Sequence, residues 1–160
     1  MVIEHPYIKN VYVAASFAYE DRDKTQSRKV DIERVVNKIK QKLEKFDINF
    51  YLPHQLKIPN AWDMSLEEWA KKVFDHDYYN LMFSNLVIFI SYGKENNSGS
   101  VWECGYAYAK GIPTIVIKMT NDSESLMISN TAHAIIREDD IENYDFVNLP
   151  VVKINLEKLS

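Results

Sequence analysis

Five short runs of apolar and β-branched residues predict strands along the chain. Consecutive apolar positions in these runs place side chains on both faces of the strand, which is typical of buried strands in a parallel sheet. The runs are NVYVAA at 10–15, INFYL at 48–52, LVIFIS at 86–91, PTIVIK at 113–118 and the weaker HAIIR at 133–137.

Helical patterns lie between these strands. Residues 65–68, Ser-Leu-Glu-Glu, form a capping box that opens one helix, which we expect to end near Ser84. Another helix is predicted from near Ser98 to Gly111, with a proline just beyond. The first helix is predicted at 27–46, where apolar residues recur at helical spacing: Ile32, Val36, Ile39, Leu43 and Phe46.

The alternation of strands and helices with short connections predicts the fold class α/β. We expect a single domain over 1–160, a doubly wound, mostly parallel five-stranded sheet with helices on both faces, flavodoxin-like or Rossmann-like. Ligands of such folds bind beyond the carboxyl ends of the strands, where strand order reverses. The loops at that edge are 15–26, 53–64, 92–103 and 119–131.

Composition narrows the class of protein. The 160 residues are 46% hydrophobic and 26% charged, as in ordinary globular proteins. A net charge of −4 argues against a nucleic-acid partner, and the single cysteine excludes an internal disulfide. The first residues lack the pattern of a signal peptide, and no apolar run approaches the roughly 20 residues of a membrane span. We therefore expect a cytoplasmic protein without a membrane partner.

One acid interrupts an apolar stripe in the helix that follows the capping box. Leu66, Trp69 and Val73 are expected to face inward, and the next position of the same stripe is Asp77. A carboxylate on a buried stripe is costly unless it is hydrogen-bonded, paired or open to a cavity. Asp77 therefore either bonds a neighbouring loop at the stripe's edge or faces a cavity.

A second acid, Glu103, lies in the first turns of the helix that follows the 86–91 strand. It either complements the helix dipole or points into the crevice at the strand ends. Two acids in one crevice can take different roles, one as a neutral donor and one as an ionised nucleophile. Tyr12, in the first strand, could hydrogen-bond a carboxylate there or simply belong to the core.

The loop KENNSGS at 94–100 is small and polar and leads into a helix N-terminus, which favours an anion or sugar hydroxyls. Gly99 allows close backbone approach, but the loop has neither the lysine of a P-loop nor a GxGxxG spacing. The four histidines lack metal-site spacing, and we expect Cys104 to be a packed thiol, so no metal site is predicted.

Several stretches resemble the nucleoside 2-deoxyribosyltransferases and the related nucleoside 5′-monophosphate N-glycosidases. The aspartate at 77 and the glutamate at 103 are 26 positions apart, as in the transferase branch. The resemblance covers most of the chain: VYVAASF at 11–17, VFDHDYYNLMFSNLVIFI at 73–90, SGSVWECGYAYAKGIPTIVI at 98–117 and the C-terminal stretch at 125–150.

The resemblance implies a mechanism. Glu103 would attack the anomeric carbon of 2-deoxyribose and form a covalent ester, and Asp77 would carry the proton of the departing and incoming base. Tyr12 would orient Glu103. A second base would complete a transfer and water a hydrolysis, and no metal or organic cofactor is implied.

The resemblance also implies substrate contacts. Gln55, in the loop LPHQ at 52–55, would bond the base edge, and Phe17 would either wall the base or belong to the core. Ser16 and Gly99 would join the substrate-binding residues. Ser125 and Met127 would reach the 5′ end of the sugar from a neighbouring subunit, which implies a homo-oligomer with a dimer as its minimal unit, or a tetramer or hexamer.

Two departures leave the reaction open. The transferases usually have an aspartate where this chain has Asn97, and an asparagine where it has Ser125. Fewer negative charges and an added hydroxyl would admit a 5′-phosphate, with Ser98 and Ser100 nearby, although Ala18 stands where an arginine could pair it. The transferase, the 5′-monophosphate N-glycosidase and a non-catalytic nucleotide-sensing module are the alternatives, and all bind nucleosides, nucleotides or nucleobases.

Overall fold

A computed structural model describes residues 8–17 and 21–149, and these form an α/β fold around one five-stranded sheet. The strand order is β2-β1-β3-β4-β5, and every neighbouring pair is parallel. The predicted parallel α/β fold is therefore confirmed. The strands are β1 (Asn10–Ala15), β2 (Asn49–Tyr51), β3 (Leu86–Ser91), β4 (Thr114–Lys118) and β5 (Ala134–Arg137).

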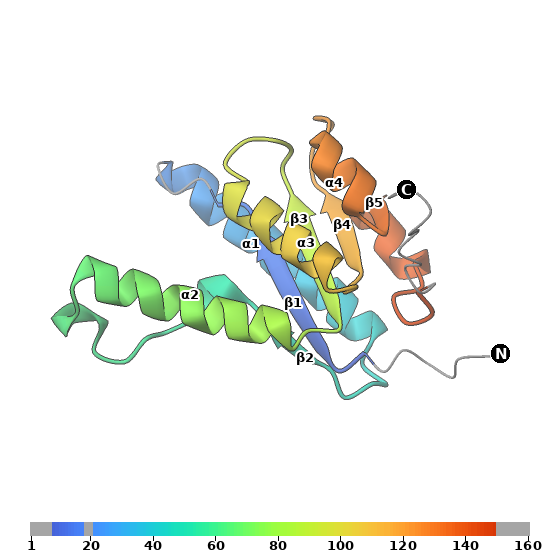
Figure 1. Cartoon of the computed structure of the whole chain (residues 1–160). Helices are drawn as coiled ribbons and strands as arrows, with labels where there is room; N and C mark the ends of the chain where they lie inside the picture. Colours follow the sequence, from blue (N-terminus) through green and yellow to red (C-terminus); the bar gives the residue numbers. More distant parts are fainter. Residues whose placement is uncertain (1–7, 18–20, 150–160) are drawn as a thin grey trace, which may run out of the picture.

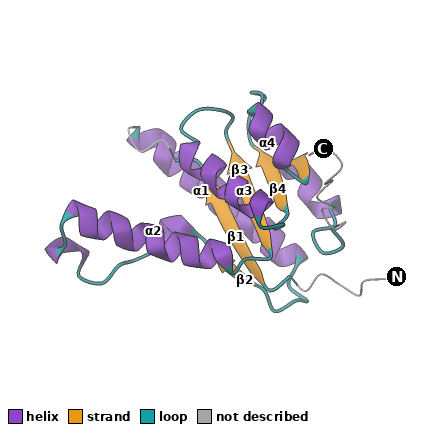
Figure 2. Ribbon diagram, viewed as in Figure 1, coloured by secondary structure: helices purple, strands orange, loops and turns teal. Residues whose placement is uncertain are grey.

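Helices cover both faces of the sheet (Figures 1 and 2). Helix α1 packs its buried aliphatic residues against one face, and α3 packs Cys104 and Ala107 against the other. No helix in the described ranges is long and apolar enough to cross a membrane. The α-helices are α1 (Arg22–Lys42), α2 (Leu66–Met82), α3 (Ser98–Ala109) and α4 (Leu126–Thr131), and the 3₁₀ helices are η1 (Pro53–Gln55), η2 (Ala61–Asp63) and η3 (Glu138–Asn143).

The order of strands fixes where a ligand can bind. The chain passes from β1 outward to β2 and then returns to β3 on the opposite side of β1. Strand order therefore reverses at β1, and the loops that follow β1 and β3 separate to opposite faces of the sheet. Such a switch point opens a crevice at the carboxyl ends of the strands.

The first predicted helix has different bounds in the structure, whereas the predicted start of the second is correct. Helix α1 begins earlier than predicted because Asp21 caps it, with its side chain accepting from the Lys24 N–H, and it ends at Lys42. Phe46 therefore lies beyond the helix and is exposed. The capping box at Ser65 is confirmed, with both of its hydrogen bonds formed.

The predicted inward stripe of α2 is wrong at its first two positions. Leu66 is 79% exposed and Trp69 42% exposed, and within α2, which is described in full, Leu81 alone is buried. The N-terminal half of the helix extends away from the sheet, as Figure 1 shows. The side chains of the stripe therefore lie on one face of α2, but only the C-terminal end of that face packs against the core.

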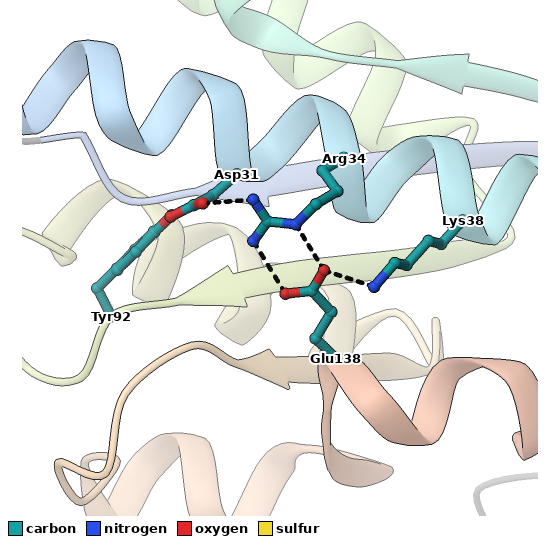
Figure 3. Close-up of polar contacts among 5 residues, drawn as sticks. All are labelled: Asp31, Arg34, Lys38, Tyr92 and Glu138. Carbon is teal, nitrogen blue, oxygen red and sulfur yellow. Dashed lines mark hydrogen bonds and ion pairs between the residues drawn. The ribbon is translucent and has the colours of Figure 1, made fainter.

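An ion-pair network joins α1 to the far end of the chain (Figure 3). The Arg34 guanidinium donates to both carboxylate oxygens of Glu138, at 2.7 and 3.0 Å, and Lys38 donates to Glu138 Oε1 at 2.7 Å. Arg34 also donates to Asp31, whose other oxygen accepts from the Tyr92 hydroxyl. The network thus fastens α1 to η3 and to the end of β3.

We expect Glu138→Gln to lower the free energy of unfolding by about 1 kcal/mol at pH 7. The hydrogen bond from Arg34 lowers the pKa of Glu138 most, and the neighbouring Lys38 adds to this, to give about 2 against an ordinary 4.5. A carboxyl with a depressed pKa stabilises the fold above its unfolded pKa, and that stabilisation is lost as pH falls from about 4.5 toward 2. Urea unfolding at several pH values should show the variant and wild type converging in this window; a constant difference would contradict it.

Candidate active site

Glu103 is held by a tyrosine from the central strand. Tyr12, fully buried in β1, donates its hydroxyl to Glu103 Oε1 at 2.7 Å. Glu103 projects from the second turn of α3, which packs on the face of the sheet from which Tyr12 points. Within the described part of the chain this is the only hydrogen bond of the Glu103 carboxylate, so Oε2 is available to a ligand.

Asp77 is held in the same way by a second tyrosine. Tyr51, the last residue of β2, donates to Asp77 Oδ1 at 2.7 Å. Tyr12 and Tyr51 are register partners on neighbouring strands, and their rings stack with centroids 5.5 Å apart. The predicted candidates Tyr12, Asp77 and Glu103 are therefore brought together, with Tyr51 as a fourth member.

A cleft of about 410 Å³ opens at the two acids. It lies at the carboxyl end of β1, the switch point of the sheet. The residues that line it come from β1 and the loop after it, the turn after β2, helix α2, and the loop after β3 with the start of α3: Val13, Ala15, Phe17, Pro53, His54, Val73, Asp77, Asn96, Ser98, Gly99, Ser100 and Glu103. Asp77 and Glu103 therefore both face a cleft, which is one of the two alternatives that the sequence left open for each of them.

Burial dominates the electrostatics of the pair. Burial raises the pKa of Glu103 to about 7, the Tyr12 hydrogen bond opposes this rise, and the charge of Asp77 adds to it. Burial also raises the pKa of Asp77, while the Tyr51 hydrogen bond lowers it. Both tyrosine pKa values are raised, first by burial, so both hydroxyls remain donors at neutral pH. Two carboxyls with raised pKa values in one cleft form a site suited to acid–base and nucleophilic chemistry.

One wall of the cleft differs from the sequence prediction. Phe17 lines this wall, and the centroid of its ring lies 5.4 Å from the centroid of the His54 ring. Gln55, predicted to contact the base, is exposed and outside the lining, because the 3₁₀ turn at 53–55 points His54 inward instead. His54 Nε2 is buried with no hydrogen-bond partner among the described residues, and burial lowers the pKa of the imidazole.

The other wall is the start of α3. Gly99 lines the cleft, and a Cβ placed there would meet no protein atom, so the space beside it is open to a ligand. Asn97 does not line it, because its side-chain amide donates to the Gly93 carbonyl at 2.9 Å and closes the loop. Asn96, in the left-handed conformation, lines the cleft together with Ser98 and Ser100.

Three other predicted contacts lie outside this cleft. Ser16 is buried, its carbonyl accepts from Arg28, and its hydroxyl has no partner in the described ranges. Ser125 caps α4 by accepting from the Ile128 N–H, and Met127 is 68% exposed. The two residues of α4 therefore do not reach the cleft of their own chain.

Sequence reasoning missed Tyr51, His54 and Asn96. Tyr51 ends a strand directly before the loop at 53–64, and that position was the available signal for it. His54 is one residue from the predicted Gln55, and Asn96 one residue from Asn97, so each loop was located with an error of one position. Within residues 8–17 and 21–149 no three His, Cys, Asp or Glu side chains come together as a metal site requires.

The fold and the paired acids define a site for acid–base and nucleophilic chemistry, and comparison with known proteins identifies the family. The family model of nucleoside 2-deoxyribosyltransferase matches residues 11–135. The chain belongs to the nucleoside 2-deoxyribosyltransferase family, and it is an enzyme that acts on nucleosides. The comparison with curated proteins gave no match.

Among the solved structures that resemble the chain are an enzyme and a conserved protein. A 2-deoxyribosyltransferase from the psychrotolerant bacterium Bacillus psychrosaccharolyticus is 26% identical, with a TM-score of 0.68, and the match covers 89% of this chain and 96% of that one. A conserved protein from Enterococcus faecalis V583 is 18% identical, with a TM-score of 0.61, over 85% of this chain and 96% of that one. The second likeness supports the fold alone.

Proposed function

We propose that this protein is a nucleoside 2-deoxyribosyltransferase that works through a covalent deoxyribosyl-Glu103 intermediate. The observation that carries the proposal is the pair of carboxylates, each anchored through one oxygen by a tyrosine and each lining one cleft. Family membership supplies the class of substrate. The anchored oxygens leave Glu103 Oε2 and Asp77 Oδ2 free to react.

The first half of the reaction forms the ester. Glu103 Oε2 attacks C1′ of 2-deoxyribose as the bond from C1′ to the base nitrogen breaks, and Asp77 gives its proton to the departing base. The ionised Glu103 stabilises the oxocarbenium-like charge on the sugar before the bond forms. The productive form of the pair therefore carries one proton, on Asp77.

The second half reverses these steps with another base. Asp77, now ionised, accepts the proton of the incoming base nitrogen, which attacks C1′ and releases Glu103. Water in the place of that base would give free deoxyribose. A cleft that holds a flat base over C1′ after the first base leaves favours transfer over hydrolysis.

The base packs against the wall formed by Phe17 and His54 in this proposal. Both rings line the cleft, and their centroids are 5.4 Å apart. We expect His54→Ala to raise KM for the nucleoside about tenfold, because the ring contact with the base is lost. Steady-state kinetics with Gln55→Ala as the exposed control tests this; equal effects of the two variants would contradict it.

A second candidate function is hydrolysis of nucleoside 5′-monophosphates. The start of α3 supports it, since Ser98 and Ser100 line the cleft where helix N–H groups favour an anion. Against it, no lysine or arginine stands among the described residues of the lining, and the buried Arg28 is turned to the Ser16 carbonyl. A neutral 5′-hydroxyl therefore fits this wall better than a phosphate.

One assay separates these functions. The protein is offered deoxynucleosides and their 5′-monophosphates, with and without an acceptor base, and products are resolved by HPLC. Exchange of base on nucleosides supports the transferase. Base release from monophosphates alone would overturn it in favour of the glycosidase, and binding without turnover would indicate the sensing module.

We also propose that the protein is a homo-oligomer with a dimer as its minimal unit. Beside the cleft, a second hollow of about 310 Å³ opens on the same two acids and is walled by Phe74, Tyr78 and Trp102. Exposed apolar side chains continue from it along α2 to Leu66, and an apolar surface of this extent marks an interface. In this proposal Ser125 and Met127 of the second copy reach the site, as the resemblance to the family implies.

Light scattering should therefore give at least twice the monomer mass, and Leu66→Lys should shift the protein toward monomer. A charge in a buried apolar contact costs more than the contact contributes. Val30→Lys, an exposed apolar position on α1, is the matched control and should leave the mass unchanged. A fully active monomer would refute the shared site.

A further inference from the structure

Tyr51 makes the one side-chain hydrogen bond that the described part of the chain offers to Asp77. Its hydroxyl lies 2.7 Å from Oδ1, and Oδ2 faces no protein donor within the described ranges. Tyr51 is partly buried, and its hydroxyl bonds one of the two oxygens of Asp77. The bond therefore holds one rotamer and one oxygen of Asp77.

The geometry of the sheet makes this arrangement rigid. Tyr12 and Tyr51 are register partners on the parallel strands β1 and β2, so their side chains leave the same face side by side. The rings stack at 5.5 Å with an interplanar angle of 30°. One stacked pair thus delivers two hydroxyls, Tyr12 to Glu103 and Tyr51 to Asp77.

We propose that Tyr51 is a positioning residue for proton transfer: it fixes Asp77 through Oδ1 so that Oδ2 exchanges the proton with the base nitrogen. This inference rests on the proposed function. As the C1′–N bond breaks, the proton leaves Asp77 Oδ2 for the base, and in the second half-reaction it returns from the incoming base. Tyr51 keeps its own proton throughout and bonds most strongly to the ionised Asp77.

Three influences act on the pKa of Asp77: burial raises it, the Tyr51 hydrogen bond lowers it, and the charge of the neighbouring His76 also lowers it but is unchanged by a substitution at Tyr51. Burial favours the neutral acid, and the Tyr51 hydrogen bond favours the carboxylate, so loss of the hydroxyl raises the pKa of Asp77. Loss of the hydroxyl also frees Asp77 to rotate. Both consequences concern only the step in which the base is protonated or deprotonated.

Tyr51→Phe tests the inference, because phenylalanine keeps the ring stack and removes only the hydroxyl. We expect kcat for an ordinary purine deoxynucleoside to fall about 10- to 100-fold with KM little changed. With 7-methyl-deoxyguanosine, whose base already carries a positive charge and leaves without a proton, the loss should be less than about threefold. The pH profile of kcat/KM with the ordinary substrate should move to higher pH.

Two control variants show what a structural role would look like. Tyr12→Phe removes the bond to the nucleophile and should slow both substrates alike. Tyr79→Phe, an exposed tyrosine two positions after Asp77, should change neither. If Tyr51→Phe slows both substrates equally and leaves the pH profile in place, Tyr51 is structural and the inference is overturned.

A titration separates this inference from the proposed function. Carbon-13 NMR of labelled aspartate side chains follows Asp77, with Asp77→Asn to assign its signal. We expect its pKa to rise in Tyr51→Phe whether or not the protein transfers deoxyribose. An unchanged pKa would overturn the inference alone, whereas absence of turnover in wild type would overturn the proposed function alone.

Discussion

Glu103→Gln is expected to reduce base exchange by about 10⁴-fold or more, because it removes the atom that bonds to C1′. The amide keeps the shape of the side chain and can still accept from Tyr12. The loss should therefore fall on kcat, with KM for the nucleoside changed little. Wild type quenched during turnover should gain the mass of one deoxyribosyl group on the peptide that contains Glu103, and the variant should not.

The same substitution is expected to stabilise the fold in alkaline solution. The folded pKa of Glu103, about 7, lies above its ordinary 4.5, so the folded state favours the neutral acid. Stability from this group is present below pH 4.5 and is lost as pH rises through 7. At pH 8 the variant should exceed wild type by on the order of 2 kcal/mol, and at pH 4 the two should agree.

Thermal and urea unfolding at both pH values measure this difference, with Glu44→Gln, an exposed glutamate after α1, as control. Opposite changes in activity and stability are the signature of a functional group held at a cost to the fold. A variant that keeps a few per cent of wild-type exchange would remove Glu103 from the role of nucleophile. If the variant is less stable than wild type at pH 8, the ionised Glu103 is not destabilised by burial, and this prediction is wrong.

The central strands were predictable because they are buried on both faces. The β1 and β3 runs, at 10–15 and 86–91, match the structure residue for residue, since apolar runs of this kind satisfy only a central parallel strand. The repeating apolar pattern of α2 was predicted correctly, but the prediction that this face packs on the core was wrong at its first positions. A repeating pattern shows which side chains lie on the same helix face, but not what that face packs against. Leu66 and Trp69 lie on a face that does not contact the core at their positions.

The candidate site was also predictable only in part. The contact of Tyr12 with Glu103 joins residues 91 positions apart, and the resemblance to a family supplied it where spacing alone left both residues ambiguous. Tyr51 could not be found this way, because its role depends on the register between β1 and β2. Register is a property of paired strands and is not written in either strand alone. His54 and Gln55 exchange places for a related reason, since a 3₁₀ turn decides which of two adjacent side chains points inward.

Asp77→Asn is expected to abolish proton transfer to and from the base while leaving nucleophilic attack by Glu103 intact. The amide retains the Tyr51 contact through its oxygen but can neither give nor take the proton, so exchange on an ordinary purine deoxynucleoside should fall about 10²- to 10⁴-fold. Release of base from 7-methyl-deoxyguanosine needs no proton and should stay within about tenfold of wild type. The ester on Glu103 then forms but cannot be discharged to a neutral acceptor base, because no group accepts that base's proton.

The deoxyribosyl-enzyme should therefore accumulate in Asp77→Asn when 7-methyl-deoxyguanosine is the donor, and intact-protein mass spectrometry would detect it. Asp75→Asn, on the same helix but exposed and paired with Lys71, is the matched control and should exchange bases as wild type does. An ordinary purine nucleoside that reacts as well as the methylated one in Asp77→Asn would mean that another group protonates the base. Of the residues that line the cleft, His54 alone could then supply that proton, because Glu103 is consumed as nucleophile and the remaining side chains carry no acid of suitable strength.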